Sequence, residues 1–299
     1  MRPGTFWKEG LDFFGISNYD ERKEFYRTAL REVNPKWVEA KDLKPNDWLL
    51  SPIDTEVKDI KFLSSPKIPN NHCTNIIKNK IVLDENFFEW LGIWLAEGSW
   101  RESGEITFTI HKNEERLANR IRELTSTIFG LKTSRYVREE HNTQIIQINS
   151  IHLSKFLENL FECEPKDINQ WNKWIPTKLL HCAPYKQLQL VKGWLDGDGY
   201  YRYKNGREYK GTTVSSVLAE GIKMILYRNY INPSVSVEYK QNRSTIYNIK
   251  FGGAAAQEFE EAINESRPVY ITNDMRLGDY FPKLVGNKLF MTNRIREVK

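Results

Sequence analysis

Cysteines and long apolar runs are scarce in this sequence. Its 299 residues include three cysteines, Cys73, Cys163 and Cys182, and no Cys-x-x-Cys pair, so we do not expect a disulfide framework. No stretch approaches the apolar length of a membrane span. The first residues, MRPGTFWKEGLDFF, lack the apolar core and the small-residue cleavage site of a signal peptide. We therefore expect a cytoplasmic protein with no membrane contact.

Motifs of several common functional classes are also missing. The sequence has no clear Ser/His/Asp set and no phosphate-cradling glycine loop, so hydrolases of that type and nucleotide-binding proteins gain no support. Two His-Cys dipeptides, His72-Cys73 and His181-Cys182, are adjacent pairs rather than the spaced sets that hold zinc, and they do not favour a zinc site. The net charge of +5 permits nucleic-acid binding without arguing for it.

Two apolar helical stretches end in a carboxylate followed by a glycine. WLGIWLAEG closes with Glu97 and Gly98, and VKGWLDGDG closes with Asp198 and Gly199, about a hundred residues later. A carboxylate near a helix C-terminus is disfavoured by about 0.3–1 kcal/mol against the helix dipole. The recurrence of this feature at equivalent places therefore needs an explanation beyond a solvated acid at a helix end.

The same order of elements surrounds both stretches. The first copy continues with a strand at 106–110, a helix capped by Asn113 and closed by Gly130, strands at 133–138 and 143–149, and a helix capped by Ser150. The second copy continues with a hairpin around Asn205-Gly206, a helix at 217–228, a hairpin around 241–243 and a helix at 254–263. Repetition of this kind predicts an α+β fold of two pseudo-symmetric αββαββα repeats.

Small residues mark one face of each acidic helix. Gly92 and Ala96 lie four residues apart, as do Gly193 and Gly197, and residues at that spacing share a helix face. A glycine inside a helix costs roughly 0.5–1 kcal/mol relative to alanine. We interpret this as a close approach of the two helices, small face against small face.

Packing of that kind would bring Glu97 and Asp198 together at the same end of the helix pair. Gly98 and Gly199 are then expected just beyond the helix ends in left-handed geometry. Two adjacent acids repel each other, and a cation between them removes that penalty. Hard divalent ions such as Mg²⁺ bind carboxylates together with substrate phosphate oxygens. Such ions also stabilise phosphoryl displacement, so the pair predicts a metal-dependent phosphodiester hydrolase.

Both stretches resemble the LAGLIDADG motif of homing endonucleases in its form with two motifs per chain. The resemblance covers roughly 83–265 and implies saddle-shaped antiparallel sheets over double-stranded DNA, with one chain acting as a monomer of internal pseudo-two-fold symmetry. It implies that Glu97 and Asp198, with the adjoining Gly98 and Gly199, form the metal site for cleavage at a long asymmetric target. Mg²⁺ is the expected ion, with Mn²⁺ or Ca²⁺ as a non-productive substitute.

The stretch NKWIP resembles the Lys-x-Ile-Pro sequence that precedes the second motif in intein-type members. The resemblance implies an active-site role for Lys173, which would polarise the phosphate or organise the attacking water. The alternative is a surface lysine before a proline turn. A counterpart in the second half is expected after its last helix, and Lys283 in YFPKL is the candidate.

Polar residues that alternate with the apolar ones form a candidate DNA surface. Arg, Lys, Gln and Asn are side chains that read base edges or contact phosphates, although an ordinary solvated sheet face fits the same pattern. The predicted DNA-binding residues are Thr107, Thr109, His111, Arg138, Gln147, Asn149, Arg202, Lys204, Arg207, Lys210, Ser236 and Lys240.

The two ends of the chain lie outside the repeats. KWVEAKDLKPNDWLLSP, from Lys36 to Pro52, resembles part of an intein N-terminal splicing segment and predicts two short strands around the LKPND turn. Splicing needs a nucleophilic first residue and a His-Asn end, whereas this sequence starts Met-Arg and finishes IREVK. We therefore expect a small β-rich remnant of a splicing domain without splicing activity.

These observations predict four segments and one principal function. The segments are an N-terminal segment at 1–80, repeats at 81–180 and 181–266, and a basic tail at 267–299 that contacts the N-terminal segment or DNA. The predicted function is that of a site-specific DNA endonuclease, associated through DNA with a nucleoid or an organelle. The alternative is a LAGLIDADG-fold DNA-binding regulator or intron RNA maturase without cleavage activity.

Overall fold

The computed structural model describes residues 36–45, 47–68, 75–203, 206–239, 244–269, 283–285 and 288–294. The chain separates into two compact units, one comprising 54–271 and the other comprising 1–53 with 272–299. No helix within the described ranges has the length and apolar content needed to traverse a lipid bilayer.

The unit at 54–271 contains the duplicated sequence. Its first repeat consists of α3 (Glu85–Glu97), β4 (Gly98–Trp100), β5 (Glu105–His111), α4 (Glu115–Phe129), β6 (Ser134–Arg138), β7 (Thr143–Asn149) and α5 (Ile151–Phe161). Its second repeat consists of α6 (Pro184–Asp198), β8 (Gly199–Arg202), β9 (Glu208–Thr213), α7 (Ser216–Arg228), β10 (Ser234–Glu238), β11 (Ile246–Gly252) and α8 (Ala254–Glu265). Short 3-10 turns lie at Glu139–His141, Pro165–Asp167 and Thr177–Leu179.

The two repeats build their sheets in the same way. The strand orders are β4-β5-β7-β6 and β8-β9-β11-β10, and every neighbouring pair is antiparallel. In both sheets the fourth strand of the repeat therefore lies between the second and the third. The predicted α+β class and the duplicated αββαββα order are both confirmed.

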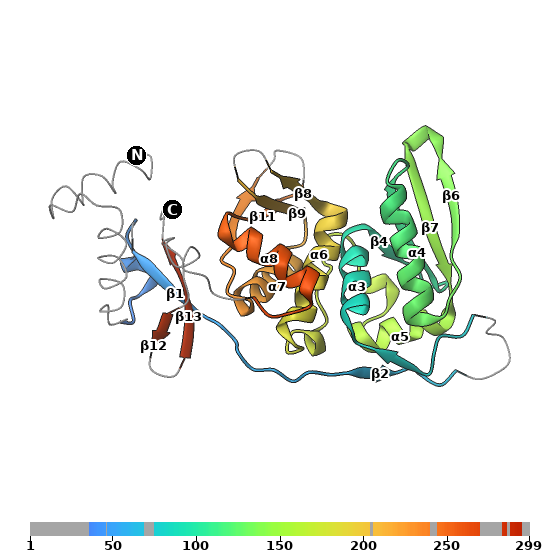
Figure 1. Ribbon diagram of the computed structural model, residues 1–299, viewed down its shortest axis with the longest axis horizontal. Helices are drawn as coiled ribbons and strands as arrows, with labels where there is room; N and C mark the ends of the chain where they lie inside the picture. The colour runs from blue at the N-terminus through green and yellow to red at the C-terminus, as the bar shows by residue number, and fades with distance from the viewer. Residues whose placement is uncertain are drawn as a thin grey trace. The chain divides into compact units, whose positions relative to one another are not determined.

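Helices α3 and α6 lie side by side between the two sheets (Figure 1). A Cβ atom added at Gly92 would lie less than 3.0 Å from the backbone oxygen of Leu190, and one added at Gly193 would lie equally close to that of Glu89. A Cβ added at Gly197 would lie 2.6 Å from the Cβ of Ala96. The helix backbones therefore touch through their small faces, as the sequence predicted.

Aromatic side chains fill the space between helices and sheet in the first repeat. Phe87 and Trp90 of α3 are fully buried and pack edge-to-face against Phe129 of α4. The Trp90 indole nitrogen donates a hydrogen bond to Thr125 Oγ1 at 3.0 Å, which satisfies its polar atom in the core. Because large rings bury much apolar surface, this cluster fixes α3 against its sheet.

In the second repeat, a glycine and a tyrosine on β9 pack the sheet against its helices. Gly211 of β9 leaves room for the ring of Trp194, because an added Cβ would lie less than 3.0 Å from that ring. Tyr209 of β9 stacks on Phe251 and meets Phe259 of α8 edge-to-face. The repeats thus share an architecture but not a core composition.

The ends of the acidic helices differ from the expected geometry. Gly98 has φ −81° and ψ 151°, and Gly199 has φ −105° and ψ 163°, so neither is left-handed and that expectation was wrong. The chain passes directly from helix into strand at both places. Glycine is required because a Cβ would collide with Trp94 at the first junction and with Leu195 at the second.

The predicted caps have mixed outcomes. Ser150 caps α5 as expected, with its hydroxyl accepting from Leu153 N at 3.0 Å. Asn113 does not cap α4: the capping residue is Glu114, whose carboxylate instead accepts from His111 N at 2.7 Å. The Glu114 side chain binds the last residue of β5 instead of capping the helix, and the helix begins one residue later than expected.

A strap from Asp54 to Lys61 leads into the first repeat and runs along the second. Lys58 N donates to His181 O at 2.7 Å, and Asp59 accepts from Ala183 N and from Lys186 Nζ. Strand β2 (Phe62–Ser64) then pairs with β3 (Lys80–Val82). The sequence-based boundary near residue 80 thus lies on β3, inside this unit.

The other unit contains a three-stranded sheet that joins both ends of the chain. Its elements are the 3-10 turn Ala40–Asp42, β1 (Trp48–Pro52), β12 (Lys283–Val285) and β13 (Lys288–Arg294). Strand β1 pairs antiparallel with β13, from Trp48 opposite Arg294 to Pro52 opposite Phe290. The prediction of two strands around the LKPND turn was wrong for the first strand, because a 3-10 turn stands in its place.

The close approach of α3 and α6 makes a prediction about stability. Gly92→Ala or Gly193→Ala should lower the free energy of unfolding by about 1–3 kcal/mol or more, because rigid backbone must move away from the new methyl group. The measurement is urea unfolding followed by circular dichroism.

Gly221→Ala is the matched control, since a Cβ on this helical glycine of α7 meets only the side chain of Ile175, at 3.0 Å. That variant should be neutral or slightly stabilised, because alanine favours the helix. Equal effects of all three substitutions would contradict the backbone contact.

Candidate active site at the ends of α3 and α6

The two acidic residues predicted from the repeated motif lie at equivalent positions. Glu97 is the last residue of α3 and Asp198 the last residue of α6. A Cβ at Gly197, next to Asp198, would lie 3.4 Å from Glu97 Oε1. The Glu97 carboxylate therefore reaches over the end of the other helix, and both acids occupy one place at the interface.

Both carboxylates are half-buried and electrostatically strained. The pKa of Glu97 is raised to about 7, first by burial and then by the charge of Asp198. The pKa of Asp198 is raised to about 6 by burial. Neither side chain makes a hydrogen bond or ion pair with any residue that the structure describes. The two acids thus form an anionic pair at the ends of the two helices.

Lys173 lies beside this pair. Its ammonium group donates to Leu95 O at 3.0 Å and to Gly98 O at 2.7 Å, at the C-terminal end of α3. Burial lowers the pKa of Lys173 to about 8, while the nearby charges of Asp198 and Glu97 oppose the change. The lysine is therefore also a structural cap, because a cation at a helix C-terminus neutralises exposed carbonyl groups.

A residue that the sequence analysis missed holds the backbone of Lys173. Ser215 is fully buried, and its hydroxyl donates to Lys173 O at 2.7 Å while accepting from Leu218 N at the start of α7. Trp171, two residues before the lysine, donates to Ser244 Oγ at 2.9 Å. A serine before a helix indicates a cap, but its second bond joins segments far apart in the sequence.

The donor set at the helix ends fits a hard divalent cation. Two carboxylates that form no ion pair with a described residue supply oxygen ligands of the kind that Mg²⁺ prefers. A positive ion would also offset the burial that raises both pKa values. Gly98 O already accepts a hydrogen bond from Lys173. The fit therefore rests on Glu97 and Asp198.

The first sheet turns a polar face away from its helices. Thr109, His111, Arg138 and Asn149 are exposed on that face and Gln147 is half-buried, its amide donating to Asn149. Thr107 was expected to be exposed but is buried, because its hydroxyl lies 2.7 Å from that of Ser99 on β4.

The basic residues predicted for the first hairpin of the second sheet lie on different faces of that sheet. Arg202 and Lys210 share the open face, since Arg202 pairs with Glu208 and Lys210 lies opposite Tyr200 and Lys250 in the register. Arg207 is on the helix side, where it forms an ion pair with Glu260 of α8 at 2.9 Å. Its side chain is still 41% exposed, and its DNA contact stays a prediction.

Two open-face residues on this sheet escaped prediction. Tyr200 is 60% exposed, and Lys250 is exposed and forms an ion pair with Glu208 at 2.6 Å. Ser236 is exposed on β10, whereas Lys204 and Lys240 lie outside the described residues. The candidate counterpart of Lys173, Lys283, begins β12 in the other unit.

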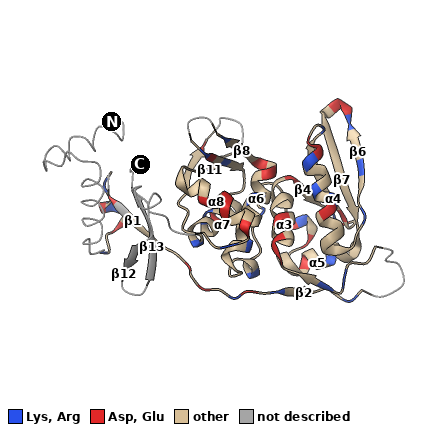
Figure 2. Ribbon diagram, in the orientation of Figure 1, with Lys and Arg blue, Asp and Glu red and all other residues tan. Residues whose placement is uncertain are grey.

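Charges of both signs are interspersed over the two repeats (Figure 2). A buried network in the motif helices illustrates this mixing. Glu89 of α3 accepts from Arg120 of α4 and from Lys192 of α6, both at 2.5 Å, and Lys192 also binds Asp196 at 3.0 Å. Asp196, the other acid of the second motif, belongs to this network and also lies 3.7 Å from Arg116 of α4 in the first repeat.

Comparisons with known proteins found relatives for part of the sequence. No protein-family model matches the chain. The chain is 33% identical over 212 residues to an uncharacterised protein of Methanocaldococcus jannaschii, a match that covers 69% of this chain and 25% of that protein. It is 28% identical over 188 residues to an ATP-dependent DNA helicase of Thermococcus kodakarensis, covering 60% of this chain and 16% of the helicase. The chain thus spans a quarter or less of these relatives.

Among solved structures, the chain is similar to variants of the homing endonuclease I-DmoI. The match has a TM-score of 0.45 and 11% identity, and covers 61% of this chain and 97% of that one. The N-terminal LAGLIDADG domain of DUF199/WhiA matches with a TM-score of 0.39 and 14% identity, over 66% and 86%. I-DmoI has been solved in complex with DNA and Mn or Ca. Similarity at this level establishes no activity, and the architecture rests on the chain's own strand orders.

The raised pKa values predict how stability depends on pH. Because folding raises the pKa of both acids, the stability they contribute is present below about pH 4 and is lost as the pH rises through about 6 and 7. In chelator, the melting temperature should fall across this window, and Mg²⁺ should restore it at pH 8 but not at pH 5. Thermal melts of the wild type and of the Glu97→Gln/Asp198→Asn double variant measure this. A double variant that keeps the same pH profile and Mg²⁺ response would contradict it.

The capping role of Lys173 makes a separate prediction. Lys173→Met should lower the free energy of unfolding by about 1–3 kcal/mol, because buried carbonyl groups at the end of α3 lose their donor. Urea unfolding measures the change. Lys178→Met is the control in the same loop: Lys178 is exposed and donates to Asn159 O and pairs with Glu162. Similar losses of unfolding free energy in both variants would contradict the capping role of Lys173.

Proposed function

We propose that this chain is a metal-dependent, site-specific double-strand DNA endonuclease of the LAGLIDADG homing-endonuclease type. The observation that carries the proposal is the paired acids, Glu97 and Asp198, at the ends of two helices in backbone contact. Both have raised pKa values, and neither forms an ion pair with a described residue, although the charge of Lys173 acts on both. A protein that only binds DNA has no need to retain such a strained pair.

In this proposal the two acids hold a divalent ion, with Mg²⁺ as the expected species. When bound, the ion would polarise the phosphate and support displacement at phosphorus. Lys173 places positive charge next to the same point and keeps the end of α3 in position through its bonds to Leu95 O and Gly98 O. Its burial excludes water from one side of the site.

The open faces of the two sheets supply the proposed DNA contacts. Arg138 on the first sheet and Arg202, Lys210 and Lys250 on the second are cations on the faces turned away from the helices. Two-stranded ribbons fit the major groove, where arginine and lysine read guanine. Because the sheets differ in sequence, the target should be asymmetric, and because one chain holds both repeats, a monomer should suffice.

The distribution of relatives supports an origin as an inserted element. Segments of similar size match proteins with unrelated names, including a DNA helicase, a probable translation initiation factor and a replication factor C small subunit. The matches fill 16%, 16% and 9% of those proteins. A shared module inside otherwise different proteins is consistent with the intein-type resemblance of NKWIP and of the N-terminal segment.

Cleavage of a duplex library with a randomised site, followed by sequencing of the products, tests the proposal. The wild type should cut one long sequence with Mg²⁺ and none with chelator. Glu97→Gln and Asp198→Asn should each lose cleavage by roughly 10²-fold or more, since charge stabilisation in the transition state is removed, while a gel-shift assay shows retained DNA binding.

Asp196→Asn is the matched control, because it neutralises an acid of the same motif whose partners are Lys192 and Arg116. It should keep cleavage within a few-fold. Full cleavage activity of the Glu97 or Asp198 variant would contradict the assignment of these acids as metal ligands. Specific binding of DNA or of intron RNA by the wild type without any cutting would favour the regulator or the maturase instead.

A further inference from the structure

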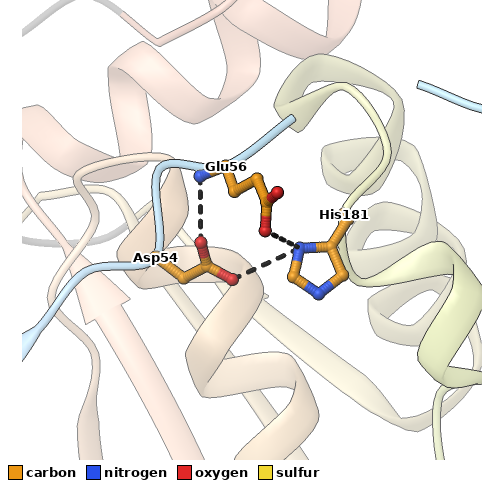
Figure 3. Close-up of side chains that lie close together, drawn as sticks. All are labelled: Asp54, Glu56 and His181. Carbon is orange, nitrogen blue, oxygen red and sulfur yellow. Dashed lines mark hydrogen bonds and ion pairs between the residues drawn. The ribbon is translucent and has the colours of Figure 1, made fainter. Parts of the chain in front are cut away.

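A second group of metal-ligating side chains lies at the other end of α6. Asp54 and Glu56 come from the strap, and His181 comes from the loop before α6 (Figure 3). Helix α6 has 15 residues, which at 1.5 Å per residue places this group about 20 Å from Asp198. It is therefore separate from the candidate active site.

The three side chains point toward a common place. His181 Nδ1 lies 3.4 Å from Asp54 Oδ2 and 3.9 Å from Glu56 Oε2, and one ligand atom from each residue lies within 4.8 Å of the others. Two ligand atoms that each lie about 2.0–2.2 Å from one tetrahedral ion are roughly 3.3–3.6 Å from each other, close to the separations between His181 Nδ1 and the two acids. A small movement of the exposed Glu56 side chain would complete the geometry.

The histidine nitrogen at this place is buried as an atom and makes no hydrogen bond to any described residue. It faces two carboxylate oxygens, yet the geometry does not meet that of a hydrogen bond. A histidine nitrogen without a hydrogen bond, facing two carboxylate oxygens, is an arrangement that a cation bound by all three groups would satisfy. This observation is independent of the number of acids nearby.

Each carboxylate uses one oxygen for the protein and turns the other toward His181. Asp54 Oδ1 accepts from Glu56 N at 2.9 Å and lies 3.6 Å from Arg228 Nη1. Glu56 Oε1 pairs with Lys58 Nζ at 2.8 Å. Outer contacts of this kind orient metal ligands before the metal arrives.

The backbone that carries the acids is also fixed. Arg228 of α7 is 5% exposed and donates to Asp54 O at 2.8 Å and to Glu56 O at 2.9 Å. It also donates to Cys182 O at 3.3 Å, next to His181. One buried guanidinium thus holds both sides of the group, which reduces the ordering cost of ligand binding.

We propose that Asp54, Glu56 and His181 bind a first-row transition-metal dication, with Zn²⁺ as the representative. One imidazole nitrogen with two carboxylate oxygens favours such ions over Mg²⁺ and Ca²⁺, which take oxygen ligands. Three protein ligands leave a coordination position for water. The ion clasps the strap to the loop before α6, immediately after the boundary between the two units at residue 53.

Calorimetric titration with Zn²⁺ alone tests the proposal. The protein carries Glu97→Gln and Asp198→Asn, so that the candidate active site does not compete. We expect this parent protein to bind one Zn²⁺ per chain. Adding His181→Ala should abolish that binding or weaken it roughly tenfold or more. The pair Asp54→Asn/Glu56→Gln should give the same loss, and the melting temperature should rise with Zn²⁺ only where the group is intact.

His141→Ala is the matched control, since His141 is an exposed histidine of the first repeat. It should bind Zn²⁺ as the parent does. Equal Zn²⁺ affinity in the parent and the His181 variant would overturn the proposal, and so would an equal loss in the His141 variant. Melts in chelator show whether each variant is folded. Zn²⁺ binding is measured without DNA cleavage. A negative Zn²⁺ result therefore does not contradict the proposed endonuclease, and absence of cleavage does not contradict the Zn²⁺ site.

Discussion

The backbone contact between α3 and α6 is the constraint on which the rest of the unit depends. Gly92 and Gly193 allow each helix to lie against carbonyl groups of the other, and no side chain larger than hydrogen fits there. Helices in ordinary contact lie 8–10 Å apart, with side chains between them. Here the absence of those side chains brings the last residues of both helices to one place, and two acids that would otherwise be solvated become a strained pair.

Features repeated in the sequence could be predicted, because the second copy of a pattern tests the interpretation of the first. The two motifs predicted that Glu97 and Asp198 end equivalent helices that pack together. The alternation around Ile106 predicted the polar face of the first sheet, apart from the buried Thr107. Lys173 was found through the resemblance of a short stretch, while its hydrogen bonds to the end of α3 explain physically why a buried lysine is tolerated there.

Features that depend on pairing between distant segments could not be predicted. A glycine after a helix usually indicates a left-handed cap, yet Gly98 and Gly199 are extended because strands begin at once. Arg207 forms an ion pair with Glu260 of α8, far along the sequence, and Lys250 was assigned to the open face only through its position opposite Lys210 in the strand register. Likewise, no spacing rule connects His181 with Asp54, more than a hundred residues earlier.

The direct passage from helix to strand at Gly98 and Gly199 has a consequence for the proposed endonuclease. With no loop to absorb movement, each acid is positioned jointly by a helix and by the edge of a sheet. Under the proposed function, side chains on the open faces would set the DNA target while the two junctions hold the acids, so the target could change without moving Glu97 or Asp198.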